Sequence, residues 1–114
     1  MAETIFKKII DRVIPAAIVY EDDLMIAIND IDPKAPTHIL IIPKKEIATI
    51  NDVQENDAEL IGKMILRAKN IAIEQGFSED GYRLVFNVNE GGGQAVFHIH
   101  LHLLGGRKFT WPPG

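Results

Sequence analysis

The spacing of apolar residues predicts a short helix near the N-terminus and a long helix in the middle of the chain. Thr4 can cap the first helix, whose apolar side chains repeat at helical spacing and are Ile5, Phe6, Ile9 and Ile10. The long helix is predicted from residue 54 or 55 to Gln75, with Gly76 as its C-terminal stop. Its apolar stripe predicts a core or subunit contact and consists of Leu60, Ile61, Met64, Ala68, Ile71 and Ala72.

The remaining apolar segments predict strands. Residues 17–20 and 24–29 flank an acidic turn and indicate a hairpin. Residues 38–42 are almost continuously apolar, which is typical of a strand buried on both faces. Two more strands are predicted over residues 82–89 and 96–104, separated by a loop of three glycines. This order of elements predicts an α+β domain built on an antiparallel sheet of about five strands.

Length and composition narrow the class of protein. A chain of 114 residues supports a single domain over residues 1–114. Its 12 basic and 16 acidic residues give a net charge of −4, which argues against binding to nucleic acid or to an anionic membrane. The lack of cysteine excludes disulfides, thiolate zinc sites and cysteine nucleophiles. With neither a targeting segment nor an apolar run of roughly 18 residues, we expect a cytoplasmic protein.

Three of the four histidines fall within five residues, on the last predicted strand. Side chains alternate between the two faces of a strand. One face would therefore carry Phe97, Ile99, Leu101 and Leu103, and the other His98, His100 and His102. The apolar face is expected to enter the core, so the histidines would project toward solvent or a cleft.

Three explanations compete for this pattern. The first explanation is that the three histidines are ordinary polar residues on a solvent-exposed face. This explanation is poor, because Thr, Lys or Glu would serve there equally well. A metal site is possible in principle, but same-face neighbours lie about 6.6–6.8 Å apart, so a further ligand is needed, for which His38 and Asp30 are candidates. Nucleophilic or acid–base catalysis would use neutral imidazole, and crowding the rings disfavours multiple protonation. Periodicity alone does not rank catalysis far above metal binding.

The segment His98-Ile99-His100-Leu101-His102-Leu103-Leu104 resembles the signature of the histidine triad superfamily, in which histidines alternate with apolar residues. Further segments resemble its Hint branch, the histidine triad nucleotide-binding proteins; they are Asp30-Ile31, Ala35-Pro36-Thr37-His38, Ile42-Pro43-Lys44-Lys45, Gly92-Gly93-Gln94 and Trp111-Pro112-Pro113-Gly114. The resemblance covers nearly the whole chain. It implies a HIT-like fold whose sheet extends across a homodimer.

The activity that this resemblance implies is hydrolysis of purine nucleoside 5′-phosphoramidates and related acyl adenylates, with no cofactor and no metal. Its ligands would be a purine nucleoside monophosphate and its phosphoramidates. By similarity, His100 would be the nucleophile and His102 would contact the phosphate oxygens. His98 would orient the ring of the nucleophile, and His38 would help relay a proton toward the leaving amine.

The resemblance also implies a set of substrate-binding residues. Asp30 would accept hydrogen bonds from the ribose hydroxyls, and Asn87 matches the family's active-site asparagine. Backbone N–H groups of Gly93 and Gln94 would approach the α-phosphate. Trp111 would pack near the partner's site and influence the choice of leaving group. The base pocket would be lined by Ile5, Phe6, Ile9 and Ile28, a set whose spacing alone indicates core.

Two positions depart from the family pattern, and other functions compete. Ala95 stands where many relatives carry a serine that can reach the leaving group, and Ile28 where some carry a phenylalanine against the base. The alternatives are a nucleotide-binding regulatory module with little turnover, a structural metal protein and a dinucleoside polyphosphate hydrolase. The Trp-Pro-Pro-Gly end weighs against the last of these.

Overall fold

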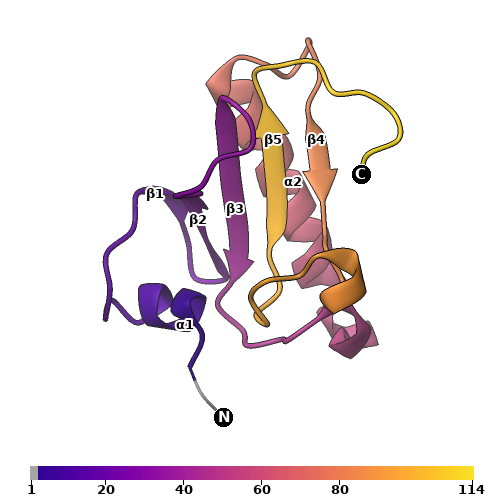
Figure 1. The fold of residues 1–114 in the computed structure, drawn as a ribbon. Helices are drawn as coiled ribbons and strands as arrows, with labels where there is room; N and C mark the ends of the chain where they lie inside the picture. The colour runs from indigo at the N-terminus through magenta and orange to yellow at the C-terminus, as the bar shows by residue number, and fades with distance from the viewer. Residues whose placement is uncertain (1–2) are drawn as a thin grey trace.

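The computed structural model describes residues 3–114, which form one antiparallel five-stranded sheet in the order β1-β2-β3-β5-β4 (Figure 1). The strands are β1 (Ile18–Glu21), β2 (Met25–Asn29), β3 (Thr37–Pro43), β4 (Arg83–Val85) and β5 (Leu101–Gly105). The α-helices are α1 (Ile5–Ile10) and α2 (Ala58–Gln75), and 3₁₀ turns cover Ile50–Asp52, Glu55–Asp57 and Glu90–Gly92. The predicted α+β class and antiparallel sheet are confirmed. Neither helix of residues 3–114 is long and apolar enough to cross a membrane.

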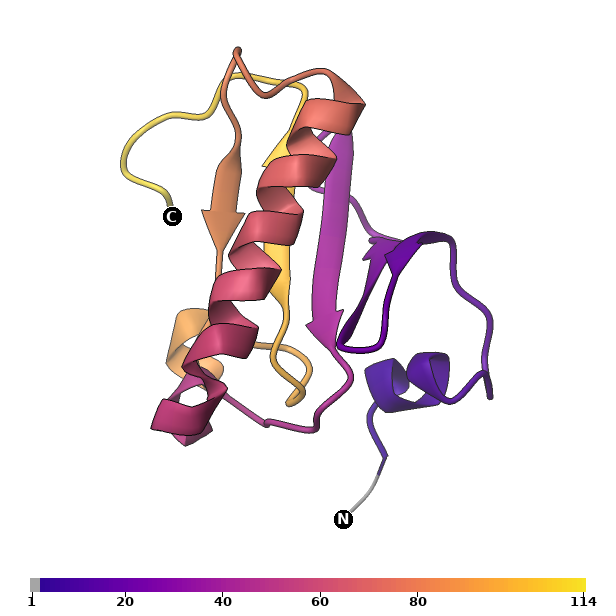
Figure 2. The same ribbon diagram turned by 180° about the vertical axis from the view of Figure 1, so that it is seen from behind.

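The helix α2 covers one face of the sheet (Figure 2). Gly76 ends it in the left-handed conformation, with a φ of 86°, and donates its N–H to the carbonyls of Ala72 and Ile73. The core on this side joins the helix to three strands and consists of Met64, Ala68, Ile71 and Ala72 with Met25, Ala27, Ile39, Ile41, Phe77, Leu101 and Leu103. The predicted apolar stripe is therefore a core contact, although its first two residues are only half-buried.

A smaller core lies on the other face of the sheet, beside α1. The side chain of Thr4 accepts a hydrogen bond of 3.1 Å from the N–H of Lys7, which confirms the predicted N-cap. The core on this side consists of Phe6, Ile9, Ile26, Ile28, Leu40 and Ile42. The strand β3 thus contributes to both cores, as its continuous apolar run predicts.

The last two strands are shorter than predicted. The strand β5 begins at Leu101 instead of residue 96, and β4 ends at Val85 instead of residue 89. Residues upstream of Leu101 leave the sheet because the N–H of Ile99 donates to the carbonyl of Ile47, a loop residue, at 2.8 Å. The side chain of Phe97 is consequently 46% exposed, so its predicted place in the core is wrong.

Gly105, at the end of β5, packs against the ring of Phe77. A Cβ built at this glycine would lie 2.5 Å from two ring atoms, Cε1 and Cζ. We expect Gly105→Ala to lower the free energy of unfolding by about 1–3 kcal/mol, because the buried ring has to move. Gly62 is the matched control, since it lies on the exposed side of α2 with no atom within 4 Å of such a Cβ. Gly62→Ala should raise the free energy of unfolding by about 0.5–1 kcal/mol through helix propensity. Urea unfolding measures both changes, and equal stability of the two variants would contradict this packing.

Candidate active site

The four histidines gather on the face of the sheet opposite α2. His102 lies on β5 opposite Leu40 of β3, and His38 lies two residues earlier on β3, so both side chains leave the same face. The ring centroids are 5.2 Å apart for His38 and His102, and 4.9 Å apart for His100 and His102. His38, a candidate site residue from the sequence, thus lies next to His102 of the triad. Of the two expected surroundings, solvent or a cleft, solvent is wrong for His98 and His100, which are buried, with 2% and 8% of their surface exposed.

The hydrogen bonds of His98 and His100 fix which ring nitrogens carry protons. Nε2 of His98 donates to the carbonyl of Pro43 at 2.7 Å, and Nδ1 of His100 donates to the carbonyl of His98 at 2.8 Å. A carbonyl only accepts, so both of these nitrogens are protonated. Neutral His100 therefore keeps a free electron pair on Nε2, the atom that a nucleophile needs. His98 positions the His100 ring through its backbone carbonyl.

A second chain of hydrogen bonds fixes His38 and His102. The backbone N–H of Lys34 donates to Nδ1 of His38 at 3.0 Å, so the proton of the neutral His38 ring is on Nε2. This Nε2–H donates to Nδ1 of His102 at 2.9 Å, which leaves the His102 proton on Nε2. Nε2 of His102 is buried and has no hydrogen-bond partner, and among residues 3–114 no other buried side-chain nitrogen or oxygen lacks one. A buried donor of this kind is available to an acceptor that enters the site, such as a phosphate oxygen.

Burial keeps all four imidazoles neutral. It is the largest cause that lowers the pKa of His38, His98 and His100 below the ordinary value of 6.5. Burial, together with the neighbouring rings of His100 and His38, lowers the pKa of His102 to about 4. Asp30 opposes the shift at His38, His100 and His102 because its negative charge favours a protonated ring. At neutral pH the nucleophilic electron pair of His100 is therefore unprotonated.

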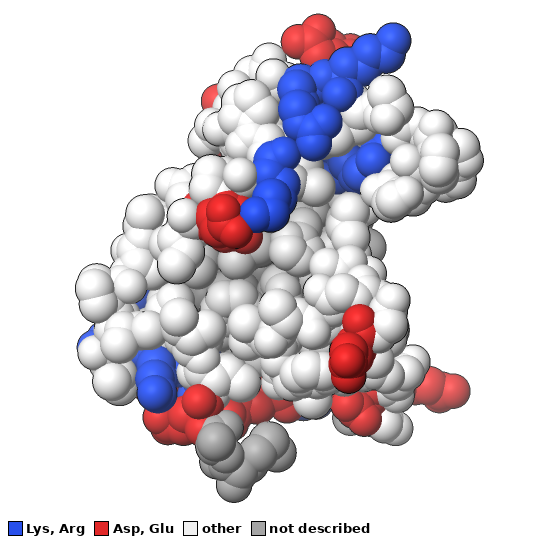
Figure 3. All heavy atoms as spheres, viewed as in Figure 1, with Lys and Arg blue, Asp and Glu red and all other residues white. Residues whose placement is uncertain are grey.

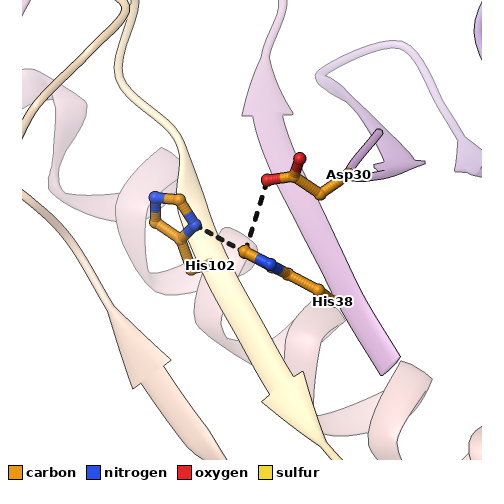
Figure 4. A group of neighbouring side chains, drawn as sticks. All are labelled: Asp30, His38 and His102. Atoms are coloured by element: carbon orange, nitrogen blue, oxygen red, sulfur yellow. Dashed lines mark hydrogen bonds and ion pairs between the residues drawn. The ribbon is translucent and has the colours of Figure 1, made fainter. Parts of the chain in front are cut away.

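Asp30 lies at the edge of the same group (Figure 4). Its Oδ2 is 3.5 Å from Nε2 of His38, and its Oδ1 accepts from the N–H of Asp32 at 2.8 Å. Ligand atoms of Asp30, His38 and His102 lie within 4.8 Å of one another, so both candidates for a further metal ligand lie beside one histidine of the triad. Ligation by Nε2 of His38 would move the ring proton to Nδ1, against the N–H of Lys34. The hydrogen bonds that run from Lys34 through His38 to His102 thus favour a protonated Nε2 on His38 over metal coordination by this atom.

A cleft of about 440 Å³ opens beside His38 and His102. Asp30 and Asn87 also line it, so the structure brings four of the predicted site residues together. Arg83, Arg107 and Phe109 complete its other wall, and sequence reasoning missed them. No local motif marks these three; only the pairing of β4 with β5 and the turn after β5 place them at the site.

The predicted base-pocket residues separate into two groups. Phe6, Ile9 and Ile28 are buried in one cluster, whereas Ile5 is 46% exposed and outside that cluster. The Phe6 ring stands edge-on to His100, with centroids 4.8 Å apart and an interplanar angle of 74°. These apolar side chains therefore form a wall next to the candidate nucleophile.

The glycine-rich loop differs from the expectation. The N–H of Gly93 donates to the carbonyl of Glu90 at 2.9 Å, and the N–H of Gln94 to that of Asn89 at 3.0 Å. Both N–H groups are therefore engaged inside the turn and are not the free phosphate donors that were expected. Ala95, the next residue, is exposed. Trp111, on the C-terminal tail, is 84% exposed.

The side chain of Gln94 holds this loop in place. Its Nε2 donates to the carbonyls of Ala48 at 2.7 Å and Val96 at 3.0 Å, and its Oε1 accepts from the N–H of Asn89 at 2.9 Å. We expect Gln94→Ala to lower the free energy of unfolding by about 2–3 kcal/mol, because three hydrogen bonds of a buried side chain are lost. Gln75→Ala, at an exposed position of α2, is the control and should change it by less than about 0.5 kcal/mol. Urea unfolding of the two variants checks this, and an unaltered Gln94→Ala protein would contradict it.

The chain resembles known proteins over nearly its whole length. The pattern of the HIT domain matches residues 11–109. Purine nucleoside phosphoramidase of Escherichia coli strain K12 is 59% identical over 105 residues, which cover 92% of this chain and 88% of that protein. An uncharacterised HIT-like protein of Synechocystis is 54% identical over 115 residues and is matched over 100% of both chains. The crystal structure of a HIT family hydrolase from Legionella pneumophila Philadelphia 1 superposes on this chain with a TM-score of 0.96. The two sequences are 62% identical, and the match covers 98% of this chain and 100% of that chain. The chain therefore belongs to the HIT family.

Proposed function

We propose that this protein is a purine nucleoside phosphoramidase that cleaves the P–N bond between AMP and an amine, and that also hydrolyses acyl adenylates. One observation carries the proposal: the unprotonated Nε2 of His100 lies beside His102, whose buried Nε2–H has no partner. A nucleophile and a donor for the charged oxygens of phosphorus are the two groups that such a transfer needs. The name of the Escherichia coli relative supports the same reaction.

The reaction proceeds in two steps. Nε2 of His100 forms a bond to phosphorus while the P–N bond breaks, and the electron pair stays on the departing nitrogen. This nitrogen takes one proton from solvent and leaves as the amine. Water then attacks phosphorus, the bond to His100 breaks, and one proton returns to solvent as AMP is released. The net reaction consumes one water and uses imidazole side chains without a cofactor.

Each remaining residue has a proposed task in this reaction. The Nε2–H of His102 donates to a phosphate oxygen, and His38 holds the His102 ring in the required protonation state. Asp30 accepts from the ribose hydroxyls, and Asn87 lies in the same cleft to contact the phosphate. Phe6, Ile9 and Ile28 form the apolar side of the base site, since they pack in one cluster and the ring of Phe6 contacts His100.

A homodimer and a cytoplasmic location complete the proposal. Within residues 3–114, β4 is an edge strand, and α2 exposes apolar side chains at Ile65, Leu66 and Ile73, which are 42%, 55% and 56% exposed. Pairing of two copies along β4 would continue the sheet and cover apolar surface. Trp111 would then pack near the partner's site. Sedimentation equilibrium tests the dimer, and a monomer at micromolar concentration would contradict it.

The function is tested by mass spectrometry of a rapidly quenched mixture of the protein with an adenosine phosphoramidate. A nucleotidyl adduct on His100 that forms and decays with turnover is the expected result. Tight AMP binding without cleavage would instead indicate a regulatory module. Faster cleavage of a dinucleoside polyphosphate than of the phosphoramidate would indicate the other hydrolase class.

A further inference from the structure

The free donor of His102 depends on one peptide N–H in the loop before β3. Nδ1 of His38 accepts from the N–H of Lys34 at 3.0 Å, and Nε2–H of His38 donates to Nδ1 of His102 at 2.9 Å. Without the contact to Lys34, the proton of the neutral His38 ring could lie on Nδ1 instead. Nε2 of His38 would then accept from Nδ1–H of His102, and Nε2 of His102 would carry no proton. The two rings therefore change together between a form that can donate to a phosphate oxygen and a form that cannot.

The turn after β5 packs against the loop that carries this N–H. Both segments lie at the same end of the sheet, where Thr37 at the start of β3 pairs with Gly105 at the end of β5 (Figure 1). Gly106 has a φ of 91°, and a Cβ built there would lie 2.9 Å from Cβ of Pro36. The backbone of the turn therefore approaches the ring of Pro36 closely. Because β5 is an interior strand of the sheet, this contact does not depend on the proposed pairing of two copies along β4.

Arg107, the next residue of the turn, binds the loop directly. Its Nη2 and Nε both donate to the carbonyl of Lys34, at 3.1 Å and 3.4 Å. Its Nη1 donates to the carbonyl of Lys108 at 3.3 Å, and its Cζ lies 4.2 Å from the ring centroid of Phe109. Stacking and hydrogen bonding thus hold this exposed guanidinium in one position. Basic side chains meet across the upper end of this face (Figure 3). Arg107 therefore links the turn to the residue whose N–H binds His38.

Two carboxylates lie near the same loop, and neither replaces this link. Oδ2 of Asp30 is 3.5 Å from Nε2 of His38, so its negative charge also favours a proton there, over a distance longer than that of an ordinary hydrogen bond. Oδ2 of Asp32 is 2.6 Å from Nζ of Lys34, an exposed ion pair within the loop. Arg107, in contrast, ties the loop to a different segment and supports the shorter contact at Nδ1 of His38.

We propose that Arg107 is a positioning residue, which holds the loop so that the N–H of Lys34 stays on Nδ1 of His38. His102 then presents Nε2–H to the phosphate. This inference rests on the proposed phosphoramidase function and adds to it a residue outside the four histidines. Arg107 acts through two successive hydrogen bonds, from Lys34 to His38 and from His38 to His102, and its role requires no contact with the substrate.

Nitrogen NMR of the imidazole rings at neutral pH, without substrate, tests this link. In the unmodified protein we expect Nδ1 of His38 and of His102 to resonate as unprotonated nitrogens and both Nε2 atoms as protonated ones. Arg107→Met removes the donors and keeps much of the side-chain length, so the Nδ1 and Nε2 resonances of both rings should move toward each other. Arg107→Lys keeps a donor and should show a smaller change. The control is Arg67→Met, which removes a guanidinium stacked 3.7 Å from the ring centroid of Tyr20 on the helix side of the sheet, and it should leave the resonances unchanged.

Kinetics with an adenosine phosphoramidate completes the test. We expect kcat to fall about three- to tenfold in Arg107→Met with little change in KM, to recover in part in Arg107→Lys, and to stay unchanged in Arg67→Met. Unaltered ring resonances in Arg107→Met would overturn the inference whatever happens to kcat, because Asp30 would then suffice to hold the proton. Altered resonances with an unaltered kcat would also overturn it. Altered resonances together with no cleavage by the unmodified protein would contradict the proposed function and leave the link between Arg107 and the histidines standing.

Discussion

His100→Ala is expected to reduce kcat for hydrolysis of an adenosine phosphoramidate by at least about a thousandfold. Nε2 of His100 has a free electron pair because Nδ1–H of the same ring donates to the backbone carbonyl of His98. Alanine supplies no nucleophile, and direct attack by water has to replace the two easier steps. Steady-state kinetics measures the loss, and the nucleotidyl adduct should disappear with it.

His100→Asn separates this loss from a change of fold. The asparagine amide can still donate a hydrogen bond to the carbonyl of His98, so the local backbone contact can be retained without a nucleophile. We expect the same loss of kcat in His100→Asn, with an unfolding midpoint nearer to that of the unmodified protein than His100→Ala shows. Activity within tenfold of the unmodified protein in either variant would place the nucleophile elsewhere.

The sequence pattern predicted the two helices and both cores because burial follows periodicity. The apolar residues of β3 are continuous, and the strand packs on both of its faces. The stripe Met64, Ala68, Ile71 and Ala72 is buried for the same reason. The residue pattern offered His38 and Asp30 only as candidate further ligands for a metal, and the place of Asn87 near the triad was accessible only through the family resemblance, since it comes from a separate segment.

Other features were beyond the sequence because they depend on contacts between distant segments. The alternation of histidines did not indicate that β5 begins only at Leu101. The strand starts late because the N–H of Ile99 donates to the carbonyl of Ile47 in a loop and not to a neighbouring strand. The protonation state of His38 depends on the N–H of Lys34, which a loop brings within 3.0 Å. Likewise, the Gly93 and Gln94 N–H groups are satisfied inside their own turn, a detail that residue types do not encode.

Acid is expected to destabilise this protein well above the pH at which its carboxylates are protonated. In the unfolded chain a histidine titrates near 6.5, whereas the pKa of His102 in the folded protein is about 4. Between these values the unfolded state binds more protons than the folded state. The free energy of unfolding therefore falls as the pH drops below about 6.5, and the loss is complete only after the pH passes through the folded pKa.

The size of this effect follows from the shift at His102. A depression from 6.5 to about 4 corresponds to roughly 3 kcal/mol, and the lowered pKa values of His38, His98 and His100 act in the same direction. Asp32 and Asp57 have lowered pKa values as well, so their contribution is lost only at still lower pH. Between pH 7 and pH 5, the change in the free energy of unfolding therefore comes from the histidines.

Urea unfolding at several pH values from 7.5 to 5 measures this dependence, and His102→Asn provides the matched comparison. The asparagine oxygen can accept from Nε2–H of His38, as Nδ1 of His102 does, but the side chain has no proton to gain. We expect the free energy of unfolding of His102→Asn to vary less steeply with pH than that of the unmodified protein, because the most strongly shifted group is gone. Parallel curves would show that His102 takes up its proton in the folded state as readily as in the unfolded state. In that case the ring could not hold the single, uncharged protonation state through which it presents Nε2–H to the phosphate.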